Sequence, residues 1–204
     1  MSEADRIDVV REAFDRRAAT YDASAMHREL ANAVADFVDI SDVQDVLDVA
    51  TGTGLVLRAL HRRGGDLRLI GVDISTGMLA VAREELPDAI WIEADAAALP
   101  IADGSMDLIT CVTALHAIPD ARATLAEWHR VLRPDGRVVT ATFAEERPPE
   151  SRVRRTAYPS DHEPYSTVDR ITNVAGSAGF RIVRTTTWTG ADDTLLVAEW
   201  MRTP

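Results

Sequence analysis

Three aspartates stand where acidic side chains can recognise one small, partly cationic molecule: Asp48, Asp73 and Asp95. Each lies at or just beyond the end of a predicted buried strand, and the carboxyl ends of parallel strands meet at one edge of an α/β sheet. Asp48 can accept a hydrogen bond from an ammonium group. Asp73, about 20 residues beyond a glycine turn, is placed to accept both hydrogen bonds of a ribose diol. Asp95 can accept one from an exocyclic amine, so the three acids predict a binding crevice.

Two of these acids also have a purely structural interpretation. Asp73 could cap the helix that follows it, although Ser75 or Thr76 can do so equally well. Asp95 could be an ordinary solvated loop residue. We favour the binding roles because acids recur at successive predicted strand ends.

A glycine turn separates the strand predicted at 46–49 from a helix that begins at Leu55. Gly52 and Gly54 let the backbone turn sharply and leave room for a ligand to approach the main chain. The helix presents free N–H groups and the positive end of its dipole to that ligand. We therefore expect the negatively charged end of a ligand at this turn.

The surroundings of the turn narrow the choice of ligand. Asp48 would repel a pyrophosphate, and Leu57 stands where a dinucleotide fingerprint places its third glycine. A ligand with both an ammonium and a carboxylate group can use the acid and the helix end together. S-adenosylmethionine has such a zwitterionic tail and a cationic sulfonium. A nicotinamide cofactor remains the alternative, because an acid such as Asp73 also binds its ribose.

Two further side chains are candidates for chemistry beside the ligand. His116 follows the strand predicted at 106–112, where a histidine can abstract a proton near neutral pH. It could equally be a substrate contact or a loop residue bonded to the backbone. Tyr21 is either a lid over the ligand or a packing residue at a helix junction.

Metal and thiol chemistry are not predicted. Cys111 lies in an apolar strand and is interpreted as a core residue rather than a nucleophile. The chain contains no lysine, which excludes a P-loop lysine and a Schiff base with pyridoxal phosphate. The other four histidines lack convincing metal-ligand spacing, so no metal is expected: His27, His61, His129 and His162.

The composition bounds the class of protein. A chain of 204 residues suits one domain that buries roughly two thirds of its unfolded surface. The net charge of −11, without a basic stripe, argues against a nucleic-acid partner. No apolar run approaches the roughly 20 residues that cross a bilayer, and no signal-peptide core is evident. A single cysteine makes the cytoplasm the expected location.

Helix and strand patterns alternate along the chain, which predicts a largely parallel sheet with right-handed crossovers. The first predicted helix carries Ile7, Val10 and Phe14 on one face. The short link at 190–193 predicts an antiparallel hairpin at the end of the chain. The expected helices cover 1–20, 25–38, 55–60, 76–85, 121–132 and 167–178, and the expected strands 46–49, 67–72, 89–93, 106–112, 137–143, 180–188 and 194–200.

The polar, proline-rich stretch at 144–166 is predicted to be a loop. It leaves the carboxyl end of the fifth strand, on the side of the crevice, so it is a candidate substrate lid. Arg152, Arg154 and Arg155 could meet an acidic substrate there. A solvated arginine run is the favoured interpretation.

Six segments in this order resemble the class I S-adenosylmethionine-dependent methyltransferases that act on small molecules, of the ubiquinone/menaquinone-biosynthesis-like group. Each segment is weak alone, but the ordered combination is specific and covers about 46–143. The segment FDRRAATYD also resembles the lead-in to these domains, which favours a place for Tyr21 at the cleft. The six segments are LDVATGTG (47–54), GVDIS-x-x-ML (71–79), EADAAALP (93–100), MDLI (106–109), ALHAIPD (114–120) and RVLRPDGRV (130–138).

This resemblance implies a Rossmann-like fold and a set of binding roles. The family's sheet has seven mostly parallel strands in the order 3-2-1-4-5-7-6, with a terminal antiparallel hairpin and helices on both faces. Two departures are Ala50, which replaces the usual first glycine and could crowd the turn, and Asp135, which replaces a glycine before the fifth strand. The resemblance implies that the methionyl tail is bound by Asp48, Ala50, Thr51 and Gly52, and the ribose by Asp73. The adenine would be contacted on its faces by Ile74 and Met78 and at its edge by Asp95 and Ala96. Gly54 and Val112 are the remaining candidate contacts.

We therefore predict a single methyltransferase domain over 1–204. It comprises a helical lead-in (1–40), a cofactor-binding core (45–143), a lid loop (144–166) and a C-terminal helix with a hairpin (167–204). The predicted reaction is in-line methyl transfer to an O-, C- or N-nucleophile of a small molecule, with S-adenosylhomocysteine as product. Membrane insertion is not expected, and a homodimer could complete the pocket. The alternatives are an NAD-dependent oxidoreductase and a non-catalytic S-adenosylmethionine-binding regulatory protein.

Overall fold

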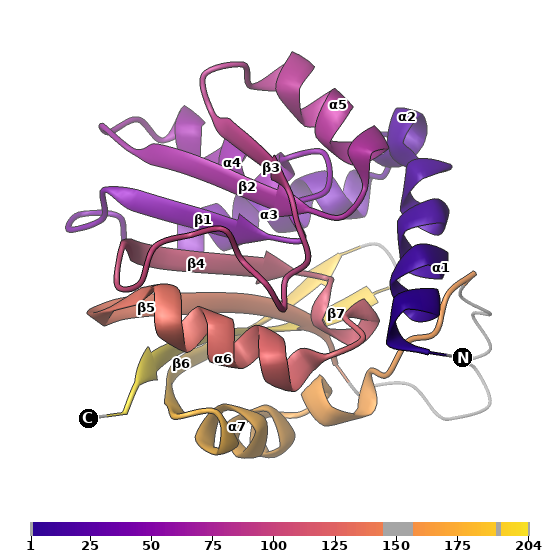
Figure 1. Ribbon diagram of the computed structural model, residues 1–204. Coiled ribbons are helices and arrows are strands. Elements are labelled where there is room, and N and C mark those ends of the chain that lie inside the picture. The colour runs from indigo at the N-terminus through magenta and orange to yellow at the C-terminus, as the bar shows by residue number, and fades with distance from the viewer. Residues whose placement is uncertain (1, 145–156, 191–192, 204) are drawn as a thin grey trace.

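The computed structural model describes residues 2–144, 157–190 and 193–203 (Figure 1). Most of the predicted lid loop, including Arg152, Arg154 and Arg155, lies outside these residues. Within the described part of the chain, no helix combines the length and apolar character needed to cross a bilayer.

The strands form one sheet in the order β3-β2-β1-β4-β5-β7-β6. The first five strands run parallel to one another, whereas β7 is antiparallel to both β5 and β6. The predicted fold class, strand order and terminal hairpin are confirmed. The strands are β1 (Asp45–Val49), β2 (Arg68–Asp73), β3 (Ile90–Glu93), β4 (Met106–Val112), β5 (Leu132–Phe143), β6 (Phe180–Gly190) and β7 (Asp193–Arg202).

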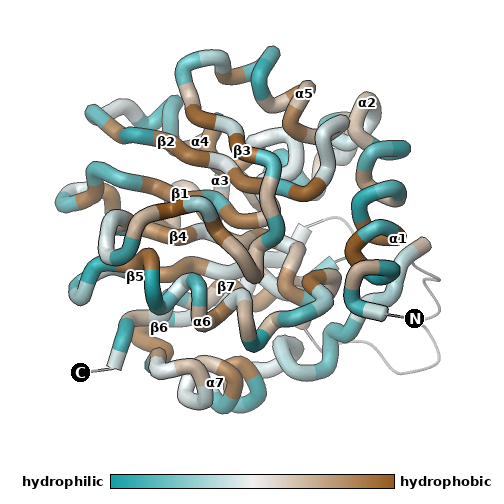
Figure 2. Tube along the Cα trace, in the orientation of Figure 1, coloured by the Kyte–Doolittle hydropathy of each residue, from teal (hydrophilic) through white to brown (hydrophobic). Residues whose placement is uncertain are grey.

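Helices cover both faces of this sheet, and two apolar clusters form the core (Figures 1 and 2). Every residue of β1 is buried, as expected for a central strand covered on both faces. One cluster includes Trp128 and Ile171 from the front helices in Figure 1, and the other includes Leu30 and Leu60 from the rear helices. The helices are α1 (Glu3–Asp15), α2 (Ala18–Tyr21), α3 (Ala25–Phe37), α4 (Leu55–Arg62), α5 (Thr76–Glu85), α6 (Ala121–Val131) and α7 (Val168–Ser177), with short 3-10 turns η1 (Leu115–Ala117) and η3 (Glu163–Tyr165).

The N-terminal segment departs from the single helix predicted over 1–20. It forms two helices, because α1 ends at Asp15 and the short α2 follows. The Asp15 side chain leaves the helix to accept hydrogen bonds from the Ser75 hydroxyl (2.6 Å) and the Gly77 N–H (2.9 Å) of α5. These bonds dock α1 across the edge of the sheet toward which the parallel strands point (Figure 1). Tyr21 is the last residue of α2 rather than a residue between helices.

The fifth strand begins earlier than predicted. It starts at Leu132 rather than Arg137, because residues 133–136 belong to the strand, with irregular pairing, instead of forming a turn between α6 and the strand. The pairing partner in β5 shifts from Leu132 to Arg137 between Met106 and Leu108 of β4. The carboxyl end of the strand, which faces the site, is regular.

Candidate binding site at the carboxyl edge of the sheet

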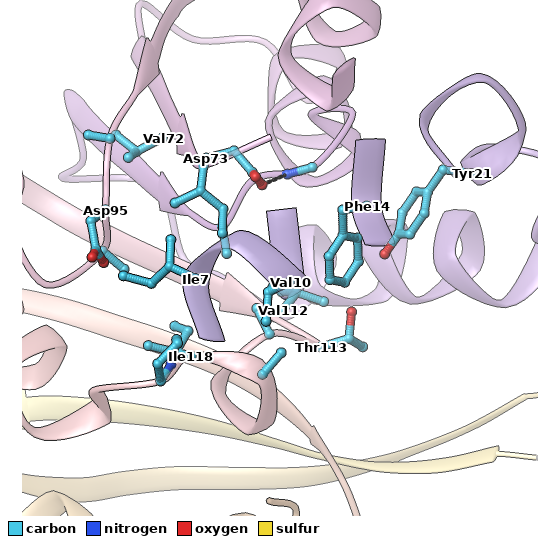
Figure 3. Close-up of a pocket in the computed structure, with 18 residues that line it drawn as sticks. Ile7, Val10, Phe14, Tyr21, Val72, Asp73, Asp95, Val112, Thr113 and Ile118 are labelled. Atoms are coloured by element: carbon cyan, nitrogen blue, oxygen red, sulfur yellow. Dashed lines mark hydrogen bonds between the residues drawn. The ribbon is translucent and has the colours of Figure 1, made fainter. Parts of the chain in front are cut away.

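Two adjoining cavities lie at the carboxyl ends of the parallel strands. The larger spans about 710 Å³ and the smaller about 400 Å³, and both volumes include space that is open to solvent. The larger cavity is lined by α1, by the ends of β2 and β4 and by the residues that follow β3 (Figure 3). The smaller one is lined by α3, by the turn after β1 and by the start of α4. Five residues line both cavities: Tyr21, Ala50, Gly52, Val112 and Thr113.

Asp73 ends β2 and lines the larger cavity. Its Oδ2 accepts the N–H of Gly52 at 2.8 Å, and its Oδ1 accepts the N–H of Ser75 at 2.8 Å. Burial raises the pKa of Asp73 to about 6, while these amide hydrogen bonds oppose the shift. Each carboxylate oxygen has a second lone pair, so the side chain can still accept hydrogen bonds from a ligand.

Ser75, not Asp73, caps the helix that follows β2. The Ser75 hydroxyl accepts the N–H of Met78 at 3.1 Å, at the start of α5. The structural interpretation of Asp73 as an N-cap is therefore wrong. The carboxylate of Asp73 instead ties the glycine turn after β1 to the end of β2.

Asp48 lines the smaller cavity from within β1. Its two carboxylate oxygens accept hydrogen bonds from the hydroxyls of Thr51 and Thr110, each at 2.6 Å. The side chain is almost fully buried, and burial raises its pKa to about 6 despite these two bonds. The acids are thus divided between two adjoining cavities: Asp73 and Asp95 line the larger one and Asp48 the smaller one.

The two glycines of the turn are required for different reasons. Both have positive φ angles, +57° at Gly52 and +78° at Gly54. A Cβ added to Gly52 would meet only the Tyr21 ring, at 4.0 Å, so the space above it belongs to the cavities. A Cβ added to Gly54 would stand 2.5 Å from Trp91. Gly54 lines neither cavity, and the space beside it is occupied by Trp91.

Ala50, the first residue of the turn, has a strained backbone. This residue has a φ of +54°, a conformation that suits glycine and costs free energy with a Cβ. The crowding predicted for Ala50 thus takes the form of an unfavourable backbone conformation. Thr51, next in the chain, lines the smaller cavity and donates its N–H to the carbonyl of Val72 at 3.0 Å.

Most of the candidates for the adenine contacts line the larger cavity. Ile74 follows Asp73, while Asp95 and Ala96 follow β3. The Asp95 Oδ1 accepts the N–H of Ala97 at 2.9 Å. Met78 differs, because its side chain is completely buried and lines neither cavity. The first turn of α5 directs it into the protein, so the structure does not support the adenine contact predicted for it.

Tyr21 lies between the two cavities and lines both. Its ring stacks on the His27 imidazole, with centroids 4.3 Å apart, and the Arg17 guanidinium lies 5.4 Å from the ring centroid. Burial raises the pKa of Tyr21 to about 12. The phenol is therefore protonated at neutral pH, and its position matches the lid interpretation better than a simple helix junction.

His116 does not reach either cavity. It lies in η1, where its ring stacks on His162 at 4.0 Å and meets the edge of Phe143 at 5.6 Å. Burial lowers the pKa of His116 to about 3, and His162 adds to the shift. A buried imidazole that is so weakly basic and directed away from the cavities is not suited to act as a base. The structure does not support that prediction, because η1 turns the side chain toward the end of β5.

Cys111 is a core residue, as predicted. It is completely buried in β4, and burial raises the pKa of its thiol far above the ordinary value. Among the described residues, no group of three or more histidine, cysteine or acidic side chains is arranged to hold a metal ion.

Several cavity residues escaped prediction. The apolar face of α1, with Ile7, Val10 and Phe14, covers the larger cavity. Its periodicity was visible in the sequence, but periodicity does not say what a helix covers. His27 and Thr113 carried no sequence signal, because only the folded chain brings them to the end of β1 and β4. No arginine lines either cavity within the described part of the chain.

Comparison with known proteins gives a family match over the strands that build this site. Residues 47–140 match the family model described as a methyltransferase domain. A malonyl-[acyl-carrier protein] O-methyltransferase from Hahella chejuensis is 38% identical over 128 residues, 61% of this chain and 46% of that protein. A demethylmenaquinone methyltransferase from Thermotoga maritima is 36% identical over 126 residues, 59% of this chain and 55% of that protein. The chain thus spans about half the length of these curated relatives.

Solved structures share the fold across the whole chain. The 1,6-didemethyltoxoflavin-N1-methyltransferase of Burkholderia thailandensis, solved with its substrate and S-adenosylhomocysteine, superposes with a TM-score of 0.79. It is 18% identical, and the match covers 100% of this chain and 92% of that one. At this identity the likeness concerns the fold alone.

Proposed function

We propose that this chain, whose residues 47–140 match the methyltransferase domain family, is an S-adenosylmethionine-dependent methyltransferase acting on a small molecule. The observation that carries the proposal is the pairing of Gly52 with Asp73. The space above Gly52 opens into both cavities, and the amide of Gly52 holds the Asp73 carboxylate at the cavity wall. A turn that has no side chain at Gly52, next to an acid that is placed to accept ribose hydroxyls, fits an adenosyl ligand with a zwitterionic tail.

The two cavities suit the two ends of such a cofactor. In the larger one, Asp73 would accept the ribose hydroxyls, and Asp95 with Ala96 would meet the adenine edge. In the smaller one, the start of α4 would receive the carboxylate and Asp48 would lie opposite the ammonium group. When bound, the cofactor supplies an activated methyl group on a sulfonium.

The residues of this chain would contribute alignment and exclusion of water rather than proton transfer. Phe14 and Tyr21 cover the cavities from the N-terminal helices. Neither the Tyr21 phenol, with a pKa raised to about 12 by burial, nor His116, with a pKa lowered to about 3, can take a proton near neutral pH. We therefore expect an acceptor that ionises easily, as a phenol or an enol does, or one with a free electron pair.

The wall of the larger cavity favours an uncharged acceptor. Beside the acids assigned to the cofactor, it consists of apolar residues of α1 and of the segment after β4, including Val10, Phe14, Ala117 and Ile118. An acceptor that is already anionic before it binds, such as a carboxylate, would meet Asp73 and the net charge of −11 without an arginine among the described lining residues. A quinol-like acceptor therefore fits better than a free carboxylate, the group that the name of the Hahella relative indicates.

The remaining features of the protein are proposed on the same basis. The single buried cysteine supports a cytoplasmic location. The chain acts as one domain, in which the N-terminal helices close the site, and a homodimer is the proposed assembly. An NAD-dependent oxidoreductase and a regulatory protein find no support among the relatives, which bear methyltransferase names.

Calorimetric titration with S-adenosylhomocysteine and, separately, with NAD tests the cofactor. We expect micromolar or tighter binding of the first and none of the second, and the reverse would overturn the proposal. Transfer of a labelled methyl group is then measured over a panel of phenols, enols, heteroaromatic amines and carboxylic acids. Turnover confined to the uncharged acceptors is expected. Tight cofactor binding without any turnover would instead support the regulatory alternative.

A further inference from the structure

The N-terminal segment FDRRAATYD (14–22) contains two aromatic residues, each followed by an aspartate: Phe14 with Asp15, and Tyr21 with Asp22. The two aromatic side chains line the larger cavity and lie side by side over it, with ring centroids 6.4 Å apart (Figure 3). The two aspartates line neither cavity. Each of them instead contacts a different wall of the proposed cofactor site.

Asp15 fastens the end of α1 to the residues that follow β2. Its Oδ1 accepts the Ser75 hydroxyl at 2.6 Å and the Gly77 N–H at 2.9 Å, and the Ser75 N–H donates to Asp73 Oδ1 at 2.8 Å. The approach is close, since a Cβ added to Gly77 would stand 3.1 Å from Asp15 Oδ1 and 3.3 Å from its Cα. A chain of hydrogen bonds therefore connects α1 with the acid proposed to bind the ribose.

Asp22 fastens the end of α2 to the glycine turn after β1. Its Oδ1 accepts the hydroxyl of Thr53, a buried residue that follows Gly52 in the turn and lines the smaller cavity. Its Oδ2 pairs with the Arg58 guanidinium of α4 at 2.6 Å. The two aspartates thus hold the N-terminal segment against both elements that form the proposed cofactor site, the end of β2 and the glycine turn.

We propose that Asp15 and Asp22 are positioning residues for cofactor binding, which hold residues 16–21 at both ends so that Phe14 and Tyr21 cover the bound cofactor. This proposal rests on the proposed function. The aspartates act through their aromatic neighbours and through the groups that they bind, without touching the ligand. If the cofactor binds tightly only to the covered form, its apparent affinity falls in proportion to the fraction of molecules that are covered.

Substitution of Asp15 tests the first anchor by calorimetric titration with S-adenosylhomocysteine. Asp15→Ala removes the acceptor of two hydrogen bonds, and we expect the Kd to rise about tenfold, as it does when the covered form falls to about a tenth of the molecules. Asp15→Asn keeps an oxygen that can accept both bonds, so its Kd should stay within about threefold of the wild type. The matched control is Asp8→Ala, which removes an exposed acid paired with Arg11 on the same helix and should leave the Kd unchanged.

Asp22→Ala tests the second anchor. It leaves Arg58 paired with Glu85 of α5 at 2.8 Å, so the guanidinium keeps an ionic partner. The expected rise in Kd is again about tenfold, because release of either end uncovers the same cavities.

Gly77→Ala tests the first anchor without altering either aspartate. Alanine favours a helix more than glycine does, so α5 itself should not be weakened. The added Cβ would nevertheless push Asp15 away from α5. We expect the Kd for S-adenosylhomocysteine to rise about threefold while the melting temperature stays within about 2 °C of the wild type. A residue that only stabilises the fold would not produce this separation of affinity from stability.

Amide hydrogen exchange of the ligand-free protein separates this proposal from the proposed function. A peptide that covers residues 16–21 should exchange about tenfold faster in Asp15→Ala and Asp22→Ala than in the wild type, with Asp15→Asn and Asp8→Ala unchanged. Exchange at the wild-type rate in both alanine variants would overturn the positioning role. Faster exchange with an unchanged Kd would overturn it as well, since the anchors would then stabilise the segment without affecting the cofactor. Failure of S-adenosylhomocysteine to bind the wild type would instead overturn the proposed function.

Discussion

The two ends of β1 carry the same residue type in opposite electrostatic surroundings. Asp45, at the start of the strand, accepts hydrogen bonds from the guanidinium groups of Arg68 (2.5 Å) and Arg133 (2.8 Å). Asp48, three residues later, accepts only from two threonine hydroxyls. Burial acts to raise both pKa values, but the arginines hold the pKa of Asp45 below its ordinary value, whereas that of Asp48 rises to about 6.

The same contrast extends along both edges of the sheet. At the amino edge, Asp107 is paired with Arg133, which keeps its pKa low although burial opposes it. At the carboxyl edge, Asp73 has amide donors but no cationic partner among the described residues, and burial raises its pKa to about 6. Acids at the amino edge are therefore neutralised within the protein and stabilise the fold. The acids at the carboxyl edge accept hydrogen bonds from amides and hydroxyls but, within the described part of the chain, have no cationic partner, which a ligand can supply.

The largest effect is expected from Asp73→Asn. An amide accepts fewer hydrogen bonds from a ribose diol than a carboxylate does, and charge-assisted bonds are worth about 1.5–3 kcal/mol each. We expect the Kd for S-adenosylhomocysteine to rise about 100-fold or more, measured by calorimetry, with an unchanged circular dichroism spectrum. If Asp73→Asn bound S-adenosylhomocysteine within a few-fold of the wild-type Kd, the proposed difference between ligand-binding acids at the carboxyl edge and stabilising acids at the amino edge would be contradicted.

The two glycines of the turn after β1 have different neighbours at this edge: Gly52 borders the cavities, whereas Gly54 borders Trp91. Gly54→Ala places a Cβ against Trp91 in a left-handed conformation, so it is expected to lower the free energy of unfolding by about 3 kcal/mol. Gly52→Ala has similar backbone strain, but its Cβ projects into the cavities. It should cost only about 1–2 kcal/mol of stability and weaken S-adenosylhomocysteine binding more than tenfold. Urea denaturation and calorimetry measure the two effects, and equal stability losses would contradict this assignment.

Asp45→Asn tests the opposite edge. It leaves two arginines without their buried partner and is expected to lower the free energy of unfolding by about 2 kcal/mol, measured by urea denaturation. Because Asp45 is remote from the cavities, the Kd for S-adenosylhomocysteine should not change. A weakened Kd in a folded variant would show that the two edges are coupled.

The smallest effect is expected from pH. Asp73 has a pKa of about 6 against an ordinary 3.8, so ligand binding requires it to lose a proton as the pH rises through that region. For one such group, S-adenosylhomocysteine should bind about tenfold more tightly at pH 7 than at pH 5. The same shift means that the native ligand-free protein holds this proton more tightly than the unfolded chain. Its stability should therefore fall as the pH rises from about 4 to about 6.

The pH response has an internal control. Asp73→Asn removes one titrating group, so the variant should show a shallower dependence of Kd on pH. The residual dependence would arise from Asp48, whose pKa is also raised to about 6 by burial. A flat profile in the wild type would contradict the raised pKa values.

The sequence by itself determined the fold class and the acids at the strand ends, whereas the strand order was predicted from the resemblance to a known family. The fold class and these acids depend on local pattern: apolar runs such as 46–49, the glycines that follow, and polar residues at the points where strands stop. The boundaries of α5 and β4 were predicted to the residue for the same reason.

Only the tertiary structure decided which side chains meet the cavities. His116 is turned away by η1, Met78 is buried beneath α5, and Gly54 faces Trp91 instead of a ligand. Thr113, which follows β4 and has a positive φ, and Tyr21 of α2 come from distant parts of the chain and line the same two cavities. Such contacts depend on how separate elements pack and on the direction of each side chain, which local periodicity does not encode.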